Sequence, residues 1–177
     1  MALATFAIGV AALRRQVGAT QSFSITGIFD PDNLYGAVTP GESSVAPGAD
    51  ATIAGQLESI PKGIVVTGLV SAPWVGECRR CAIELGGLLE VAVRERFVEG
   101  ATDEDEAYPL EGEILDLFDL VRDSLVLELP IAPLCREDCK GLCVTCGADR
   151  NEGECGCESP IDPRWASLET LRSPEEA

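Results

Sequence analysis

The stretch GIVVTGLVSAPWVGECRRCAIELGGLLEVAVRERF, residues 63–97, places a Cys-x2-Cys pair between two candidate strands. Residues 63–72 form an apolar run that suits a buried strand. Residues 88–97 alternate apolar and charged side chains, as a half-exposed strand does, with a slip of one residue near Arg94. The stretch therefore predicts a β-rich body that carries a thiol pair, Cys78 and Cys81, between two of its strands.

Further strand candidates lie on the N-terminal side of this stretch. Phe6, Ile8 and Val10 alternate as in a short strand, and a helical turn is expected just after them at 13–17. Pro-Gly pairs mark a loop over residues 36–49. Short strands with turn signals between them and no long intervening helix predict an antiparallel sheet or a small barrel. The other strand candidates are residues 22–29 and 51–57.

One helix is expected after the strands. An acidic break at 99–106 precedes an apolar repeat at three- and four-residue spacing, with Asp116 as a plausible N-cap and Pro130 beyond the end. This predicts an amphipathic helix at about 116–128 whose apolar face lies on the sheet. The fold class is then α+β, with a β-rich domain at 1–130 and a Cys-rich tail at 131–177 packed on it. The repeat comprises Leu117, Leu120, Val121, Ser124 and Leu125.

Six of the eight cysteines crowd the tail, which has few periodic apolar residues and needs a staple in place of a core. Eight thiols are the number that two tetrahedral zinc sites require. Cys143-Val-Thr-Cys146-Gly147 has the form of a zinc knuckle, and the nearby Cys-Gly-Cys can complete that site. The predicted ligands are Cys78, Cys81, Cys135 and Cys139 for one zinc and Cys143, Cys146, Cys155 and Cys157 for the other.

Spacing alone leaves other assignments open. Cys139 and Cys143 could exchange sites, or the tail could hold a single zinc with Cys78 and Cys81 as a spare pair. Disulfides are a further alternative, but they suit an oxidising compartment. The apolar run at the N-terminus is followed, not preceded, by Arg14 and Arg15, and it is too short to span a bilayer. We therefore expect a cytoplasmic protein whose clustered thiols bind metal.

The composition restricts the chemistry further. The chain has 30 acidic and 13 basic residues, a net charge of -17, and no histidine. The lack of histidine excludes His-based acid–base catalysis, and a zinc closed by four thiolates has no open position for water. We therefore expect no enzyme activity, no small-molecule substrate and no membrane partner. A strongly acidic protein repels a phosphate backbone and attracts basic proteins.

The cysteine pattern resembles that of the bacterial YceD family, also called DUF177. The resemblance rests on Cys78-Arg79-Arg80-Cys81, on the run from Leu129 through the tail cysteines, and on Asp162-Pro163-Arg164-Trp165. Ala82 stands where the family usually has Leu, and Val144 where it commonly has Pro; neither change removes a ligand. The resemblance implies a role in the accumulation of large-subunit (23S) ribosomal RNA, through its synthesis, processing or stability. It implies no catalytic residue.

Three functions follow as hypotheses. The first is a non-enzymatic ribosome-biogenesis factor that escorts a basic ribosomal protein or assembly factor, in contact with the pre-ribosomal large subunit or its 23S rRNA. The second is an RNA-binding module, and the third is a thiol redox or metal-relay protein that uses Cys78 or Cys81. Trp74 and Trp165 are expected to close core edges. The RNA-binding hypothesis requires a contiguous patch of Arg14, Arg15, Arg79, Arg80, Arg94 and Arg96.

Overall fold

The computed structural model describes residues 6–29, 43–46, 48–102, 105–157 and 164. The largest sheet has the strand order β2-β4-β5-β6-β7, with β3 beside the far end of β5, and β1 pairs separately with β8. All pairings are antiparallel except β6 with β7. In chain order the elements are β1 (Ala7–Gly9), η1 (Leu13–Arg15), β2 (Thr20–Ile28), β3 (Ser43–Val45), β4 (Asp50–Ile60), β5 (Gly63–Glu77), β6 (Glu84–Val98), β7 (Tyr108–Pro109), β8 (Ile114–Asp116) and α1 (Phe118–Glu128).

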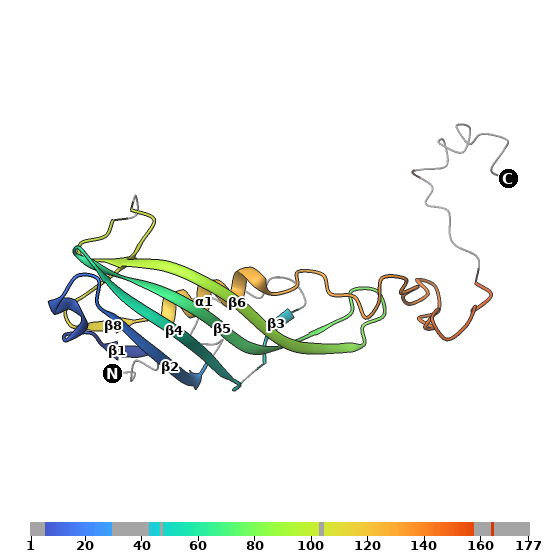
Figure 1. Ribbon diagram of the computed structural model, residues 1–177. Helices are drawn as coiled ribbons and strands as arrows, with labels where there is room; N and C mark the ends of the chain where they lie inside the picture. The colour runs from blue at the N-terminus through green and yellow to red at the C-terminus, as the bar shows by residue number, and fades with distance from the viewer. Residues whose placement is uncertain (1–5, 30–42, 47, 103–104, 158–163, 165–177) are drawn as a thin grey trace.

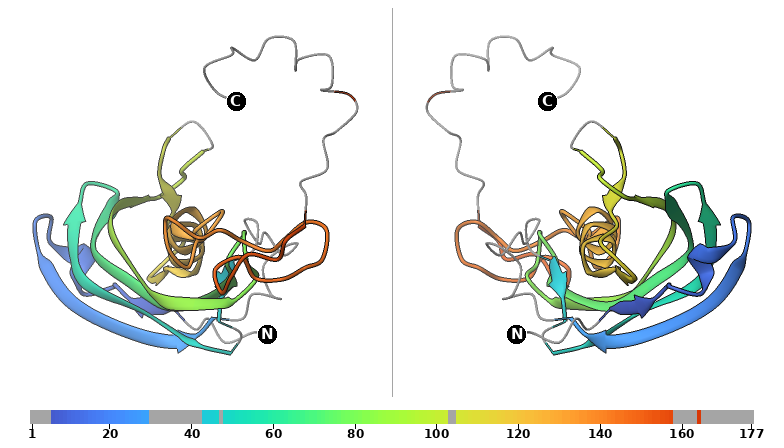
Figure 2. Two further views of the ribbon diagram at one scale, coloured as in Figure 1. Left: turned by 90° about the vertical axis from the view of Figure 1, so that its right-hand side faces the viewer. Right: turned by 90° about the vertical axis from the view of Figure 1, so that its left-hand side faces the viewer.

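The large sheet curves around α1, which lies on its concave side (Figures 1 and 2). The predicted α+β class, an antiparallel sheet with one main helix, is confirmed. The sheet of the described residues stays open, with β2 and β7 at the ends of the strand order, so the alternative of a small barrel is not what forms.

Strand alternation decides which side chains enter the core. Leu89, Val93 and Phe97 of β6 are buried, and the charged residues between them, Arg94 and Arg96, are exposed. The alternation continues without a break to Phe97, so the slip expected near Arg94 does not occur. Curvature is possible in the middle of the sheet because Gly55 and Gly68 face each other across β4 and β5. A Cβ at Gly55 would lie 2.1 Å from the carbonyl oxygen of Thr67.

The helix begins two residues later than predicted, at Phe118, and Leu117 occupies the N-cap position. Asp116 is the last residue of β8, and its Oδ1 accepts the backbone N–H of Phe118 at 2.9 Å. The Asp116 carboxylate therefore accepts one of the backbone N–H groups of the first helical turn that have no partner within the helix, although Asp116 is not the N-cap residue. The apolar face of α1 packs on β5 and β6, as expected, with Leu120, Val121 and Leu125 buried.

Three strands are longer than predicted, and one lies where a loop was expected. β4 and β5 extend to Ile60 and Glu77, and β6 starts at Glu84. The predicted loop at 36–49 contains β3, which pairs with Trp74, Val75 and Gly76 of β5. Trp74 is partly buried against the core, whereas Trp165 lies outside the described residues.

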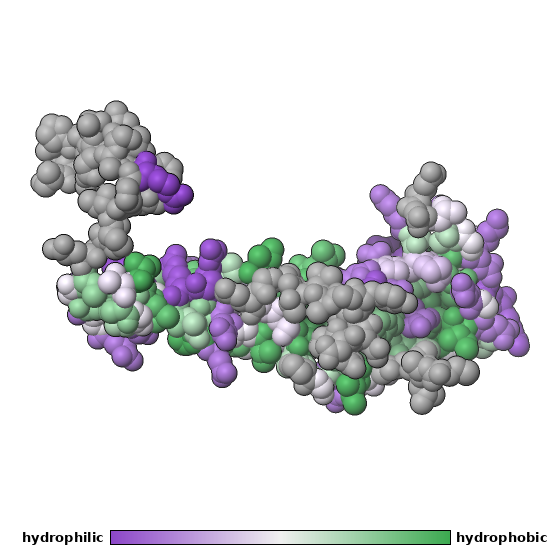
Figure 3. All heavy atoms as spheres, turned by 180° about the vertical axis from the view of Figure 1, so that it is seen from behind, coloured by the Kyte–Doolittle hydropathy of each residue, from purple (hydrophilic) through white to green (hydrophobic). Residues whose placement is uncertain are grey.

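The ends of β5 and β6 extend beyond β4 and form a hairpin arm, defined here as residues 73–88. The pairing of β4 with β5 ends at Thr52–Ser71, while β5 and β6 stay paired to Glu77 and Glu84. The described part of the tail, residues 131–157, lies at the end of this arm, far from the N-terminal strands (Figure 1). Seen from behind, the molecule shows hydrophobic side chains along its middle, and its hydrophilic ones gather most densely at the right end of the view (Figure 3). In the described part of the chain, no helix has the length and apolar character to cross a membrane.

Candidate metal centre

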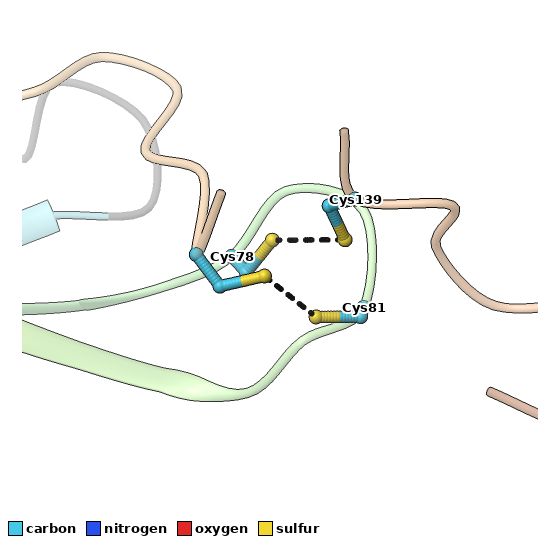
Figure 4. Close-up of side chains that lie close together, drawn as sticks. Cys78, Cys81 and Cys139 are labelled. Atoms are coloured by element: carbon cyan, nitrogen blue, oxygen red, sulfur yellow. Dashed lines mark hydrogen bonds between the residues drawn. The ribbon is translucent and has the colours of Figure 1, made fainter. Parts of the chain in front are cut away.

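The inner cluster consists of Cys78, Cys81, Cys135 and Cys139, at the tip of the hairpin arm. Cys78 and Cys81 flank the turn after β5, and the tail brings the other two thiols against them (Figure 4). The Sγ atoms of Cys78 and Cys139 are 3.9 Å apart, and those of Cys81 and Cys135 are 3.7 Å apart. All four sulfurs lie within 4.8 Å of one another, and all four cysteines are free thiols.

These distances fit a tetrahedral metal site. Zinc–sulfur bonds of about 2.3 Å in a tetrahedron place the sulfurs roughly 3.8 Å apart. The two sulfur–sulfur distances of the inner cluster lie on either side of that value. Cys78 and Cys139 are 2% and 3% exposed, which excludes bulk water from two of the ligands. The inner cluster can therefore hold a zinc-sized cation with four thiolates.

Backbone amides support the thiolate form of Cys78. Burial of this thiol opposes ionisation, but backbone N–H groups of Cys135, Arg80 and Cys81 outweigh burial and lower the pKa of Cys78 to about 6. For Cys135, burial and the neighbouring thiols of Cys139 and Cys81 raise the pKa to about 12. Four thiolates this close repel one another, so their joint ionisation requires a cation between them.

Arg80 fastens the tail to the hairpin turn. Its Nη1 donates to the carbonyl oxygens of Cys139, at 2.8 Å, and Glu137, at 3.1 Å. Its own carbonyl accepts the N–H of Leu142 at 2.9 Å. Gly141 fits beside it with φ +71°, and a Cβ there would lie 2.7 Å from the Arg80 carbonyl oxygen. The arm and the tail are thus joined by hydrogen bonds as well as by the four thiols.

The outer cluster consists of Cys143, Cys146, Cys155 and Cys157, whose sulfurs also lie within 4.8 Å of one another. Backbone N–H groups of Cys146 and Thr145 lower the pKa of Cys143 to about 6. The knuckle turn closes when Gly147, at φ +74°, donates its N–H to the carbonyl of Cys143 at 2.8 Å. In contrast to the inner cluster, three of its cysteines, all but Cys143, are exposed.

Asn151 links the two clusters. It lies in the loop between the knuckle and Cys155, yet its Nδ2 donates to the Sγ of Cys139 at 3.5 Å. Its Oδ1 accepts the backbone N–H of Lys140 at 2.8 Å and a guanidinium N–H of Arg136 at 2.7 Å. Burial opposes ionisation of Cys139, but the Asn151 amide and the N–H of Gly141 together lower its pKa. A residue of the outer loop therefore orients a ligand of the inner cluster.

The structure brings the eight thiols together in the two sets of four that the sequence favoured, and Cys139 and Cys143 do not exchange. Metal binding by these sets, and its identity as zinc, stay predictions. Asn151 and Arg80 were not identified as positioning residues from the sequence, because their contacts join segments distant along the chain. The sequence signal for Asn151 was its position between the Cys143–Cys146 pair and the Cys155–Cys157 pair.

Comparison with known proteins gives a family match over more than half of the chain, from within β5 through the helix and into the tail. A family model described as "Large ribosomal RNA subunit accumulation protein YceD" matches residues 66–172. An uncharacterized protein of Mycobacterium tuberculosis is 40% identical over 126 residues, which cover 68% of this chain and 61% of the relative. An uncharacterized protein of Mycobacterium leprae is 33% identical over 134 residues, which cover 72% of this chain and 62% of the relative.

A plant protein is also similar. The chloroplastic large ribosomal RNA subunit accumulation protein YCED homolog 1 of Arabidopsis thaliana is 38% identical over 66 residues, which cover 37% of this chain and 21% of the relative. This chain spans about three-fifths of the length of the mycobacterial relatives it matches. No solved structure matches it.

Proposed function

This chain belongs to the YceD family, and we propose that it is a non-enzymatic ribosome-biogenesis factor that binds a basic ribosomal protein or assembly factor. In this role it supports the synthesis, processing or stability of 23S rRNA in the cytoplasm, in contact with the pre-ribosomal large subunit. The observation that carries the proposal is the charge of the chain, -17, together with the positions of its arginines. Such a protein attracts a basic partner and repels bare RNA.

The arginines of the RNA-binding hypothesis do not form one patch. Arg79 lies at the tip of the hairpin arm, and Arg94 lies ten residues along β6 from Glu84, the end of that strand. At about 3.4 Å per residue, that distance along the strand is roughly 34 Å. A phosphate backbone would therefore meet pairs of arginines separated along the sheet and no continuous basic patch, which favours a protein partner over direct RNA binding.

Several arginines already have partners within the fold. Arg14 of η1 bonds to the Glu99 carboxylate and to the carbonyl of Gly112. Arg80 donates to two tail carbonyls, and Arg96 donates to the carbonyl of Asp105 at 3.2 Å. These side chains would have to leave their partners to contact phosphate, which further weakens the RNA-binding hypothesis.

The metal sites act as scaffold in this proposal. When bound, zinc would hold the arm and the tail together and neutralise part of the thiolate charge. Cys78, Cys81, Cys135 and Cys139 would hold one ion, and Cys143, Cys146, Cys155 and Cys157 the other. Cys78 and Cys139 are buried and face three other thiols, an arrangement that favours a closed ligand set over a redox pair with an accessible nucleophile.

Affinity capture tests the proposal. The tagged chain is used to capture proteins from lysate with and without ribonuclease, and the bound proteins are identified. We expect a basic ribosomal protein or assembly factor to remain bound after ribonuclease treatment and to elute with salt, because the attraction is electrostatic. A partner set that disappears with ribonuclease would favour RNA binding, and capture of no ribosomal protein or assembly factor would contradict the proposal.

A further inference from the structure

The outer edge of β2 has no strand beside it in the part of the chain that the structure describes. β2 pairs with β4 over nine consecutive residues, Thr20 to Ile28, without a bulge. It is the first strand in the order of the large sheet. Alternate residues of such an edge strand direct their N–H and C=O groups away from the sheet, so nine residues present a continuous row of backbone donors and acceptors.

The chain protects its other long edge but not this one. On the edge of β6 that faces away from β5, the described residues supply only the two-residue pairing with β7, but β6 carries five charged side chains and packs against α1. β7 contains Pro109, which cannot donate to a further strand. β2 reads TQSFSITGI and contains no charged residue and no proline. Sheet edges are usually protected by charged residues, by proline or by an element that covers them. The sequence of β2 supplies neither charge nor proline.

On the concave face of the sheet, the apolar side chains of β2 are not fully covered. Phe23 and Ile25 point toward the core side but are only partly buried, whereas their neighbour on β4, Ile53, is fully buried. One more strand beside β2 would cover both side chains if it placed apolar residues opposite them. The edge therefore offers apolar contacts on one face as well as backbone hydrogen bonds.

The convex face of the same edge is acidic at both ends. Across β2, Thr20 pairs with Glu58 and Ile28 pairs with Asp50, and both acidic residues are exposed. A strand added beside β2 would lie about 10 Å from β4. A lysine or arginine opposite Thr20 or Ile28 can span β2 and reach the carboxylate beyond it.

We propose that β2 binds an extended segment of a basic protein as an additional antiparallel strand. The proposal rests on the proposed function and specifies how its basic partner is recognised. The segment carries Lys or Arg opposite Thr20 and Ile28, eight residues apart, and β-branched or apolar residues opposite Phe23 and Ile25. Backbone pairing provides the affinity, and the two faces of the strand provide the selectivity.

A synthetic peptide tests this chemistry without a ribosomal partner. The probe is KTTVTVTTK, with lysines at both ends and valines at the two positions facing Phe23 and Ile25. Titrated into the full chain, it should shift the NMR signals of Thr20–Ile28 and slow hydrogen exchange at about half of these amides, those that face away from β4. The peptide ETTVTVTTE should bind roughly tenfold more weakly. Equal binding of the two peptides, or shifts located elsewhere, would overturn the proposal.

A pair of lysine variants supplies the matched test in the protein. Ser24→Lys places a charge on the exposed face of β2, and Thr67→Lys places the same charge on the same face of β5, two strands away from the edge. Ser24→Lys should weaken binding of KTTVTVTTK at least roughly fivefold, because a charged side chain on an edge strand opposes the addition of another strand. Thr67→Lys should change binding less than about twofold, because its charge lies two strands from the edge. The same loss in both variants would contradict edge pairing.

Two outcomes separate this proposal from the proposed function. If the wild-type chain captures a basic ribosomal protein and Ser24→Lys captures it equally well, the function stands and the β2 proposal fails. If no such protein is captured but KTTVTVTTK still adds to β2, the edge chemistry stands and the proposed function fails. Slow exchange of the outward amides of β2 in the free chain would also overturn the proposal, because another part of this chain would then occupy the edge.

Discussion

Replacement of Asn151 by alanine should weaken metal binding at the inner cluster. The variant loses the Nδ2 donor to the Cys139 sulfur and the Oδ1 acceptor for the Lys140 N–H. Each such hydrogen bond contributes about 1 kcal/mol net, so about 2 kcal/mol is lost from the geometry that holds this ligand. That free energy corresponds to roughly 30-fold weaker metal binding, within the 10–100-fold range typical of residues that support ligands.

Native mass spectrometry across a chelator titration measures this effect, because it counts the metal ions retained per chain. We expect Asn151→Ala to lose an ion at a chelator concentration roughly 30-fold lower than the wild type does. Glu152→Ala is the matched control, since Glu152 is exposed and adjacent in the same loop. Release within twofold of wild type in Asn151→Ala would refute the role of Asn151 as the link between the clusters.

The remaining predictions concern the body of the fold. Gly55→Val should lower the free energy of urea unfolding by about 2–3 kcal/mol, because its side chain would enter the space of the Thr67 carbonyl, 2.1 Å from the Cβ position. Gly9→Ala, whose Cβ meets nothing within 4 Å, should change this free energy by less than about 1 kcal/mol. Tyr108→Phe should cost about 1 kcal/mol by removing the 3.1 Å hydrogen bond to Asp123. Burial and then the Asp123 carboxylate raise the pKa of Tyr108 above its ordinary value of 10.0, so its neutral form stabilises the fold below pH 10 and this contribution is lost as the pH rises. Thermal melting should therefore show a smaller loss of stability above pH 10 in Tyr108→Phe than in wild type; equal losses would contradict this assignment.

The alternation of apolar and polar residues predicted the strands in which it is regular. It missed β3 and the ends of the longer strands, where the alternation is interrupted. β3 has three residues and lies within a Gly- and Pro-rich stretch, so its pairing with β5 depends on a distant strand. Pro73 and Gly86 hid the length of the hairpin arm, because these residue types are depleted in strands. Pro73 is tolerated because it lies between the part of β5 that pairs with β4 and the part that pairs with β3. Its carbonyl accepts the N–H of Ala46, and its missing donor points toward the same side.

The sequence favoured the grouping of the thiols that the structure shows, although spacing alone left the exchange of Cys139 and Cys143 open. The hydrogen bonds around the thiols could not be predicted. Arg80 bonds to the Cys139 carbonyl across 59 positions, and Asn151 reaches Cys139 across 12. The Arg80 contact exists only once the tail has folded onto the arm, and the Asn151 contact only once the outer loop has folded back on the inner cluster, so no local pattern identifies them. The predicted set that joins Cys78 and Cys81 to two tail cysteines already placed the tail beside the turn between two strands, but the length of that hairpin was underestimated.

Metal stoichiometry tests the central claim most directly. Each of the two sets of four cysteines, with sulfurs within 4.8 Å of one another, should bind one ion, and the ion of the inner cluster should join the tail to the hairpin arm. Native mass spectrometry of the purified chain, combined with elemental analysis, should give two zinc ions per chain with all eight thiols reduced. A chain that carries disulfides, or that has no metal while fully folded, would contradict the account.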